Sequence, residues 1–172
     1  KRRHPVMPDL QHLLDRADHL LARLQQHRDW DHDAVAKAVN VEYTYDSNRI
    51  EGNTLTLRET DLVVHKGLTI GGKPLIEHLE AINHYEAVDV IRDLAKQNAP
   101  FNRHTLLSLH ALILRSIDKR YAGRYRDIPV SISGSRHIPP QPWQIDKQME
   151  DYFHFYDTHH TALALHPILL AA

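Results

Sequence analysis

The stretch DSNRIEGNTLTLRET, residues 46–60, contains the end of one predicted helix and the beginning of the next. A helix-compatible run rich in tyrosine and valine stops at Gly52, a residue that favours the left-handed backbone of a helix end. Thr56 followed by Glu59 is the pattern of a capping box, which opens a new helix that Gly67 closes. The stretch therefore predicts a fold of helices joined by short turns.

Glu51 is an unusual residue for the end of the first of these helices. The C-terminal end of a helix carries partial negative charge and favours lysine, arginine or histidine. An acidic side chain there is either solvated or meets a positively charged group from another part of the protein. The helix pattern alone leaves both interpretations open.

Apolar residues at helical spacing predict further helices along the chain. They mark residues 10–24, 33–50, 74–94, 102–117 and 145–156, and a last helix begins near Pro167. The helix over 33–50 is marked by Val35, Ala36, Val39 and Tyr43. The segment RDIPVSISGSRHIPP, residues 126–140, is β-branched around Ser133-Gly134-Ser135 and predicts a short β-hairpin over Asp127–Ile138. The predicted fold class is all-α with a single hairpin.

Composition excludes several classes of protein. The 172 residues suffice for one domain, and their net charge of −1 lacks the basic face of a nucleic-acid binder. The absence of cysteine excludes disulfides, thiolate zinc sites and thiol nucleophiles, and it fits a cytoplasmic location. No apolar run approaches the roughly 18 residues of a membrane span, and no signal peptide is visible. Because LALHPILLAA, residues 163–172, is a helical pattern without a stop signal, we expect the chain to continue.

Three features suggest other chemistry but lack the context it needs. The segment GLTIGGK, residues 67–73, matches part of a phosphate-binding P-loop, but Pro74 stands where Ser or Thr would hold magnesium. No two of the 15 histidines are three or four residues apart, the spacing that puts two metal ligands on one helix face. No G-x-S-x-G elbow accompanies the serines. We therefore expect no metal site and no complete active site in this stretch.

Several segments, in order, resemble the Fic family. TYDSNRIEGNTLTLRET (44–60) resembles the inhibitory motif [S/T]xxxE[G/N], in the form where the inhibitory helix precedes the Fic core. TIGGKPLIEHLEAINHYEA (69–87) resembles the segment that follows it. AGRYRDIPVSISGSRHIPPQPWQIDKQM (122–149) resembles the family's flap hairpin, and LHPILLAA (165–172) the start of the helix that leads into the active site. The resemblance covers roughly residues 40–172.

The resemblance implies a Fic-like helical bundle with one flap hairpin, acting as a protein adenylyltransferase. Such an enzyme moves AMP from ATP onto a Ser, Thr or Tyr hydroxyl of a protein, with Mg²⁺. The family's catalytic signature, HxFx[D/E]GNGRxxR, is absent and by the family's spacing would begin beyond Ala172. No catalytic residue and no metal ligand is therefore assigned within these residues.

The motif assigns an inhibitory role to Ser47, Glu51 and Gly52. Glu51 is expected to hold the second arginine of GNGRxxR, which otherwise grips the γ-phosphate of ATP. In the flap, the residues expected to contact the nucleotide or the target protein are Ile132, Ser133, Gly134, Ser135, Arg136 and His137.

The resemblance also divides the chain into N-terminal helices with the inhibitory helix, residues 1–55, and a partial Fic core, residues 56–172. A target protein is expected to dock on the flap, homodimerisation stays open, and no membrane or nucleic-acid partner is expected. Two alternatives to the adenylyltransferase stay open: a catalytically inactive interaction or regulatory module, and an all-α scaffold that binds other proteins.

Overall fold

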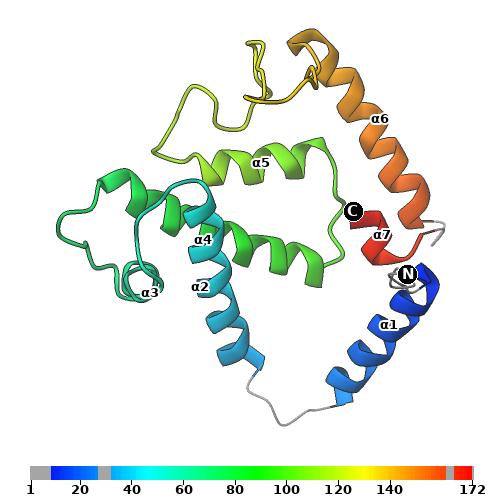
Figure 1. Cartoon of the computed structure of the whole chain (residues 1–172), viewed down its shortest axis with the longest axis horizontal. Coiled ribbons are helices and arrows are strands. Elements are labelled where there is room, and N and C mark those ends of the chain that lie inside the picture. The colour runs from blue at the N-terminus through cyan, green and yellow to red at the C-terminus, as the bar shows by residue number, and fades with distance from the viewer. Residues whose placement is uncertain (1–8, 27–31, 162–164, 172) are drawn as a thin grey trace, which may run out of the picture. The chain divides into compact units, whose positions relative to one another are not determined.

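The structure, a computed structural model, describes residues 9–26, 32–161 and 165–171. Its helices are α1 (Leu10–Gln26), α2 (His32–Ile50), α3 (Leu57–Lys66), α4 (Leu75–Lys96), α5 (Arg103–Ile113), α6 (Pro142–Thr161) and α7 (Pro167–Ala171) (Figure 1). The chain divides into two compact units. One contains α2 to α5 and most of α6, and the other contains α1, the end of α6 and α7. The predicted all-α class is confirmed, whereas the division into residues 1–55 and 56–172 stays a prediction.

The start and end of α3 follow the local signals in the sequence. The Thr56 hydroxyl accepts a 3.3 Å hydrogen bond from the backbone N–H of Glu59, and the Glu59 carboxylate accepts one of 2.8 Å from the N–H of Thr56. These bonds hold the pKa of Glu59 below its usual value. Gly67 ends the helix with φ +63°. The predicted capping box and glycine stop are therefore confirmed.

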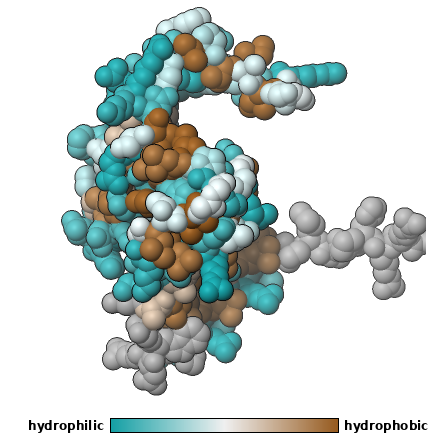
Figure 2. All heavy atoms as spheres, turned by 90° about the vertical axis from the view of Figure 1, so that its left-hand side faces the viewer, coloured by the Kyte–Doolittle hydropathy of each residue, from teal (hydrophilic) through white to brown (hydrophobic). Residues whose placement is uncertain are grey.

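An apolar seam joins α3 to α4. Its buried side chains are Leu55, Val63 and Ala81, and Val64, Ile70 and Ile82 pack against them. His78, also buried, ties the α3–α4 connection to α4, because its Nε2 accepts from the N–H of Ile70 at 2.8 Å and its Nδ1 donates to the carbonyl of Pro74 at 2.9 Å. The GLTIGGK segment is thus a turn between two helices. Some apolar side chains of this region remain exposed: Leu57, Leu68, Leu75 and Ile76. Figure 2, which views the molecule from the side on which α3 lies, shows brown areas among teal ones.

A polar seam joins α2 to α4. Asn40 and Thr44 of α2 are completely buried, whereas Val39 and Tyr43, which mark the helix in the sequence, are 51% and 57% exposed. The Asn40 amide donates to the carboxylate of Asp89 at 2.9 Å. α2 therefore buries Asn40 and Thr44 together with Val41, and leaves Val39 and Tyr43 largely exposed to solvent.

The helix α5 is shorter than the pattern over residues 102–117 predicts. It begins at the predicted cap, where the Asn102 carboxamide oxygen accepts from the N–H of Thr105 at 3.0 Å. It ends at Ile113, because the buried amide of Asn83 in α4 donates to the carbonyls of Ile113 and Arg115, at 3.0 and 2.7 Å. Ser116 then adopts φ +63°, which a helix cannot accommodate. The extension to Ile117 was wrong.

The strands of the hairpin predicted over Asp127–Ile138 are not formed. The turn is present, since the N–H of Ser135 donates to the carbonyl of Ile132 at 3.1 Å. Gly134, the second central residue, has φ +75°, and Ser133 does not have a positive φ. A hairpin turn of the type that matches strand twist needs positive φ at both central residues or at the first, so this turn splays the two sides apart.

The second unit contains α1, the end of α6 and α7. Among its described residues, Leu14 is a buried apolar residue, and the Nε2 of His166 lies 3.0 Å from the carboxylate of Asp18. The other leucines of α1 are exposed to water: Leu10, Leu13, Leu20, Leu21 and Leu24. Throughout the described residues, no helix combines the length and the hydropathy that crossing a membrane requires.

Candidate functional site

The C-terminal end of α2 is closed by a Schellman motif with Glu51 at the C-cap. The N–H of Gly52 donates to the carbonyl of Arg49 at 3.1 Å, and the N–H of Asn53 donates to the carbonyl of Asn48 at 3.0 Å. Gly52 adopts φ +97°, a conformation that side-chain-bearing residues rarely take. The glycine of the predicted inhibitory motif therefore has a definite structural task, which is to end the helix directly after Glu51.

The residues that follow fix this helix end to α4. Asn53 is buried and donates from its amide to the Glu77 carbonyl at 3.0 Å and to the Glu80 carboxylate at 2.9 Å. The backbone N–H and the hydroxyl of Thr54 donate to the Glu77 carboxylate at 3.1 and 2.8 Å. Lys73 donates to the carbonyl of Thr54 at 2.6 Å. Glu51 thus stands at a well-anchored position.

The carboxylate of Glu51 itself is exposed and, among the described residues, has no hydrogen-bond or ion-pair partner. The nearest cation along the chain, Arg49, is engaged elsewhere, since it pairs with Asp46 at 3.2 Å and lies 5.7 Å from the ring centroid of Tyr45. Ser47, one turn before Glu51, is half-buried. The described residues therefore present an anchored acid at a helix end without the cation that would favour it there.

The second group of predicted site residues forms the tip of the segment between α5 and α6. Ile132, Ser133, Gly134, Ser135, Arg136 and His137 are all exposed. The N–H of His137 donates to the Ser135 hydroxyl at 3.0 Å, which keeps the tip compact. No hydrogen bond or ion pair within the described residues joins this tip to Glu51, so the structure does not bring the two groups into contact.

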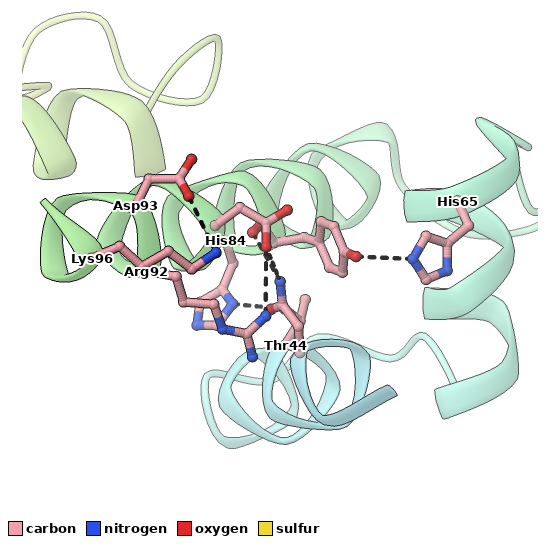
Figure 3. A network of polar contacts seen from close by, with 9 residues as sticks. Thr44, His65, His84, Arg92, Asp93 and Lys96 are labelled. Atoms are coloured by element: carbon pink, nitrogen blue, oxygen red, sulfur yellow. Dashed lines mark hydrogen bonds and ion pairs between the residues drawn. The ribbon is translucent and has the colours of Figure 1, made fainter. Parts of the chain in front are cut away.

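Sequence reasoning missed the polar seam behind Glu51. Figure 3 shows Thr44 of α2 pointing at His84 of α4, and the Thr44 hydroxyl lies 2.9 Å from its Nδ1. Burial lowers the pKa of His84. Asn48, the next residue in this stripe, has a buried amide nitrogen that finds no hydrogen-bond partner among the described residues. The sequence does contain the signal, because Asn40, Thr44 and Asn48 repeat at a spacing of four residues on one helix face.

A second polar chain joins α3 to α4 beside this seam. His65 donates from Nδ1 to the Asp61 carboxylate at 2.7 Å, and its Nε2 is hydrogen bonded to the Tyr85 hydroxyl at 2.9 Å. Burial, with the nearby charge of Asp89, raises the pKa of Tyr85. In the described part of the chain, no three His, Asp or Glu side chains gather as metal ligands. The hydrogen bonds of His65 thus link α3 to α4.

The chain is similar to proteins of known family. Residues 100–172 match the Fic/DOC family. Two curated relatives are named Protein adenylyltransferase Fic. The one from Nematostella vectensis is 31% identical over 137 residues, which cover 79% of this chain and 31% of the relative. The one from Drosophila virilis is 30% identical over 136 residues, which cover 79% of this chain and 27% of the relative. The chain thus spans roughly a third or less of these relatives' length.

Solved structures show the same fold. Fic-1 (aa134–508) from C. elegans has a TM-score of 0.73 and 25% identity, over 94% of this chain and 48% of that one. A Fic domain containing signaling protein from Bacteroides thetaiotaomicron has a TM-score of 0.77 and 22% identity, over 90% of this chain and 60% of that one. Residues 100–172 of this chain belong to the Fic/DOC family, and the described part of the chain has the fold of these Fic structures.

Proposed function

We propose that the intact protein is a protein adenylyltransferase, which transfers AMP from ATP to a hydroxyl group of a target protein. The observation that carries this proposal is the similarity to relatives named protein adenylyltransferase over 79% of the chain. In the reaction, the target oxygen attacks the α-phosphorus of ATP, the bond from that phosphorus to the β-phosphate oxygen breaks, and pyrophosphate leaves. The hydroxyl proton goes to a general base.

We assign none of the chemical groups that this reaction needs to the described residues, because the signature HxFx[D/E]GNGRxxR is not among them. No cluster of three potential metal ligands occurs among them, so we assign no Mg²⁺ ligand to them. Mg²⁺, when bound with ATP, neutralises phosphate charge. The base and the phosphate-binding backbone belong to the signature HxFx[D/E]GNGRxxR, which the family resemblance puts after Ala172. These residues contribute the control of the reaction and the docking of the target.

Control is the role that we propose for Glu51. An acid at a helix C-terminus costs about 0.3–1 kcal/mol unless a positive group faces it. An arginine that paired bidentately with Glu51 would make the contribution of this acid to stability favourable. The same arginine could then no longer hold the γ-phosphate of ATP. The Schellman motif and the contacts of Asn53 support this proposal, because they hold Glu51 in place for such a pair. Ser47, one turn earlier on the same side of α2, would steady the carboxylate.

Docking is the role that we propose for the tip of the flap segment. Residues 132–137 are exposed and their backbone forms no ladder, so an extended target peptide can add its main chain beside them. The tip would also lie beside the nucleotide, as the resemblance implies.

The experiment uses the full-length protein and ATP labelled at the α-phosphate. Glu51→Gln keeps the size of the side chain and removes its charge, and we expect label transfer to rise at least about tenfold, as loss of one charged hydrogen-bonded contact predicts. Glu42→Gln is the matched control, since Glu42 is an exposed acid on the same helix. If the Glu51 variant incorporates no label at saturating ATP and Mg²⁺, the protein is no adenylyltransferase, and the inactive regulatory module takes its place. Equal labelling by the Glu51 variant and wild type would contradict the inhibitory role alone.

A further inference from the structure

The flap segment, residues 127–140, has two sides that the structure connects in an unusual way. We call residues 127–131 the first leg and residues 136–140 the second leg. Both legs run from well-fixed ends, since the first follows Tyr125, whose ring lies 5.1 Å from the Arg103 guanidinium, and the second leads into α6. Between them lie exposed residues without strand pairing. Something other than a backbone ladder must therefore set how far apart the legs stand.

A backbone ladder is unavailable for reasons that the sequence makes plain. In a hairpin centred on Ser133-Gly134, with Ile132 and Ser135 as a hydrogen-bonded pair, the next hydrogen-bonded pairs would be Val130 with His137 and Ile128 with Pro139. The N–H of His137 is already given to the Ser135 hydroxyl. Pro139 has no N–H to give to the Ile128 carbonyl.

The side chain of Arg126 replaces the missing donors. Its Nη1 donates to the carbonyl of Ile128, in the first leg, at 3.0 Å. Its Nη2 donates to the carbonyl of Pro140, in the second leg. Within the described chain, apart from the turn at the tip, no other hydrogen bond joins the two legs. One planar guanidinium, which holds its donors in a rigid fork, thus bridges the base of the flap.

We propose that Arg126 is a positioning residue for target binding, which holds the two legs at a fixed separation so that the exposed tip, residues 132–137, can align a target peptide. This inference rests on the proposed docking role of the flap. Because the Arg126 guanidinium donates hydrogen bonds to one carbonyl on each leg, it holds the two legs at one distance from each other. Without the Arg126 bridge, the two legs are joined only at the tip of the flap. Binding of a target peptide would then have to order the flap, and the free energy that this costs would weaken the binding. The guanidinium of Arg126 is engaged by carbonyls of the two legs, so we expect the effect of its loss to fall on the binding of the target.

The test combines a structural and a kinetic measurement on the full-length protein. Spin labels at Val130 and Ile138, both exposed and one on each leg, report the distance distribution between the legs. Arg126→Gln removes the bridge. Arg126→Lys keeps the positive charge and hydrogen-bond donors on one nitrogen, but not the planar fork of the guanidinium. Arg124→Gln removes an exposed neighbouring arginine and is the matched control. We expect a broader distribution for Arg126→Gln, an intermediate one for Arg126→Lys, and the wild-type distribution for Arg124→Gln.

In the kinetic measurement, Arg126→Gln is expected to raise the KM for the target protein about tenfold, the loss that one charged hydrogen-bonded contact predicts, while the KM for ATP and the melting temperature stay as in wild type. Arg126→Lys should recover part of that loss. An unchanged distance distribution in Arg126→Gln overturns the proposal, whether or not AMP is transferred. So does a KM for ATP that rises as much as the KM for the target, or an effect of equal size in Arg124→Gln. A wild-type protein that transfers no AMP but shows the expected broadening contradicts the proposed function and leaves the bridge established.

Discussion

The helix α4 buries apolar side chains against α3, beside the hydrogen bond between His65 and Tyr85, and meets buried polar side chains of α2. Towards α3 it buries Ala81 against Leu55 and Val63. Towards α2 it meets Asn40 and Thr44, which are completely buried and hydrogen bonded to Asp89 and His84. The first seam depends on burial of area, which has no directional requirement. The second depends on the geometry and the protonation of a few hydrogen-bonding groups. The packing of α2, the helix next to Glu51, is therefore the one that we expect to change with pH.

The largest expected effect comes from the apolar seam. Leu55→Ala removes a side chain that is 4% exposed, and we expect the free energy of unfolding to fall by about 2–5 kcal/mol because a cavity remains. Urea unfolding followed by circular dichroism measures this. Leu75→Ala, at a leucine that is 68% exposed, is the control, with an expected change within about 0.5 kcal/mol. Similar losses for both variants would mean that this seam is not the core of the unit.

A smaller loss is expected from the polar seam. Asn40→Ala leaves the Asp89 carboxylate without the amide that donates to it, which should cost about 1–3 kcal/mol in the same unfolding measurement. Val39→Ala, on the solvent face of the same helix, should change the free energy of unfolding by no more than about 0.5 kcal/mol. The reverse order of these two effects would show that α2 packs through its apolar stripe after all.

The smallest expected effect is a dependence of the free energy of unfolding on pH, which arises at His84 in the polar seam and not in the apolar seam. Burial lowers the pKa of His84 from its ordinary 6.5, so the folded state disfavours the charged ring. The contribution of His84 to stability is therefore fully present above about pH 6.5 and is lost as the pH falls towards the folded-state pKa. Between pH 7 and pH 5, stability should fall more steeply in wild type than in His84→Gln, by less than the limit for one proton, about 1.4 kcal/mol per pH unit. If the curves of stability against pH are parallel for wild type and His84→Gln, the protonation of His84 does not contribute to this pH dependence.

Local signals predicted α3 well and failed elsewhere for physical reasons. The Thr56–Glu59 box and Gly67 act within one turn of the helix they bound, so neighbouring residues suffice to predict them. The end of α5 depends on Asn83, which is 30 residues before the carbonyl of Ile113 that it caps. No pattern around Ile113 contains that information, and the predicted helix was too long.

The same contrast applies to the candidate site. The spacing of Ser47, Glu51 and Gly52 was visible in the sequence, and Gly52 does end the helix there. Which face of α2 is buried was not visible, because the valines and the Asn40–Thr44 stripe both repeat with helical spacing. In the flap, β-branched residues favoured strands, but the second-position glycine of the turn and Pro139 decided against a ladder.

The polar seam also has a consequence for the order in which the protein is made. Asn40 and its partner Asp89 are 49 residues apart, so a ribosome that synthesises about 5–20 residues per second completes α2 seconds before its docking site exists. The face of α2 that waits carries amides and a hydroxyl, which water satisfies, whereas an apolar docking face would be exposed to other nascent chains. The α3–α4 seam forms from residues closer together in the chain. We therefore expect α2, which ends directly before Glu51, to dock only after α4 has been synthesised.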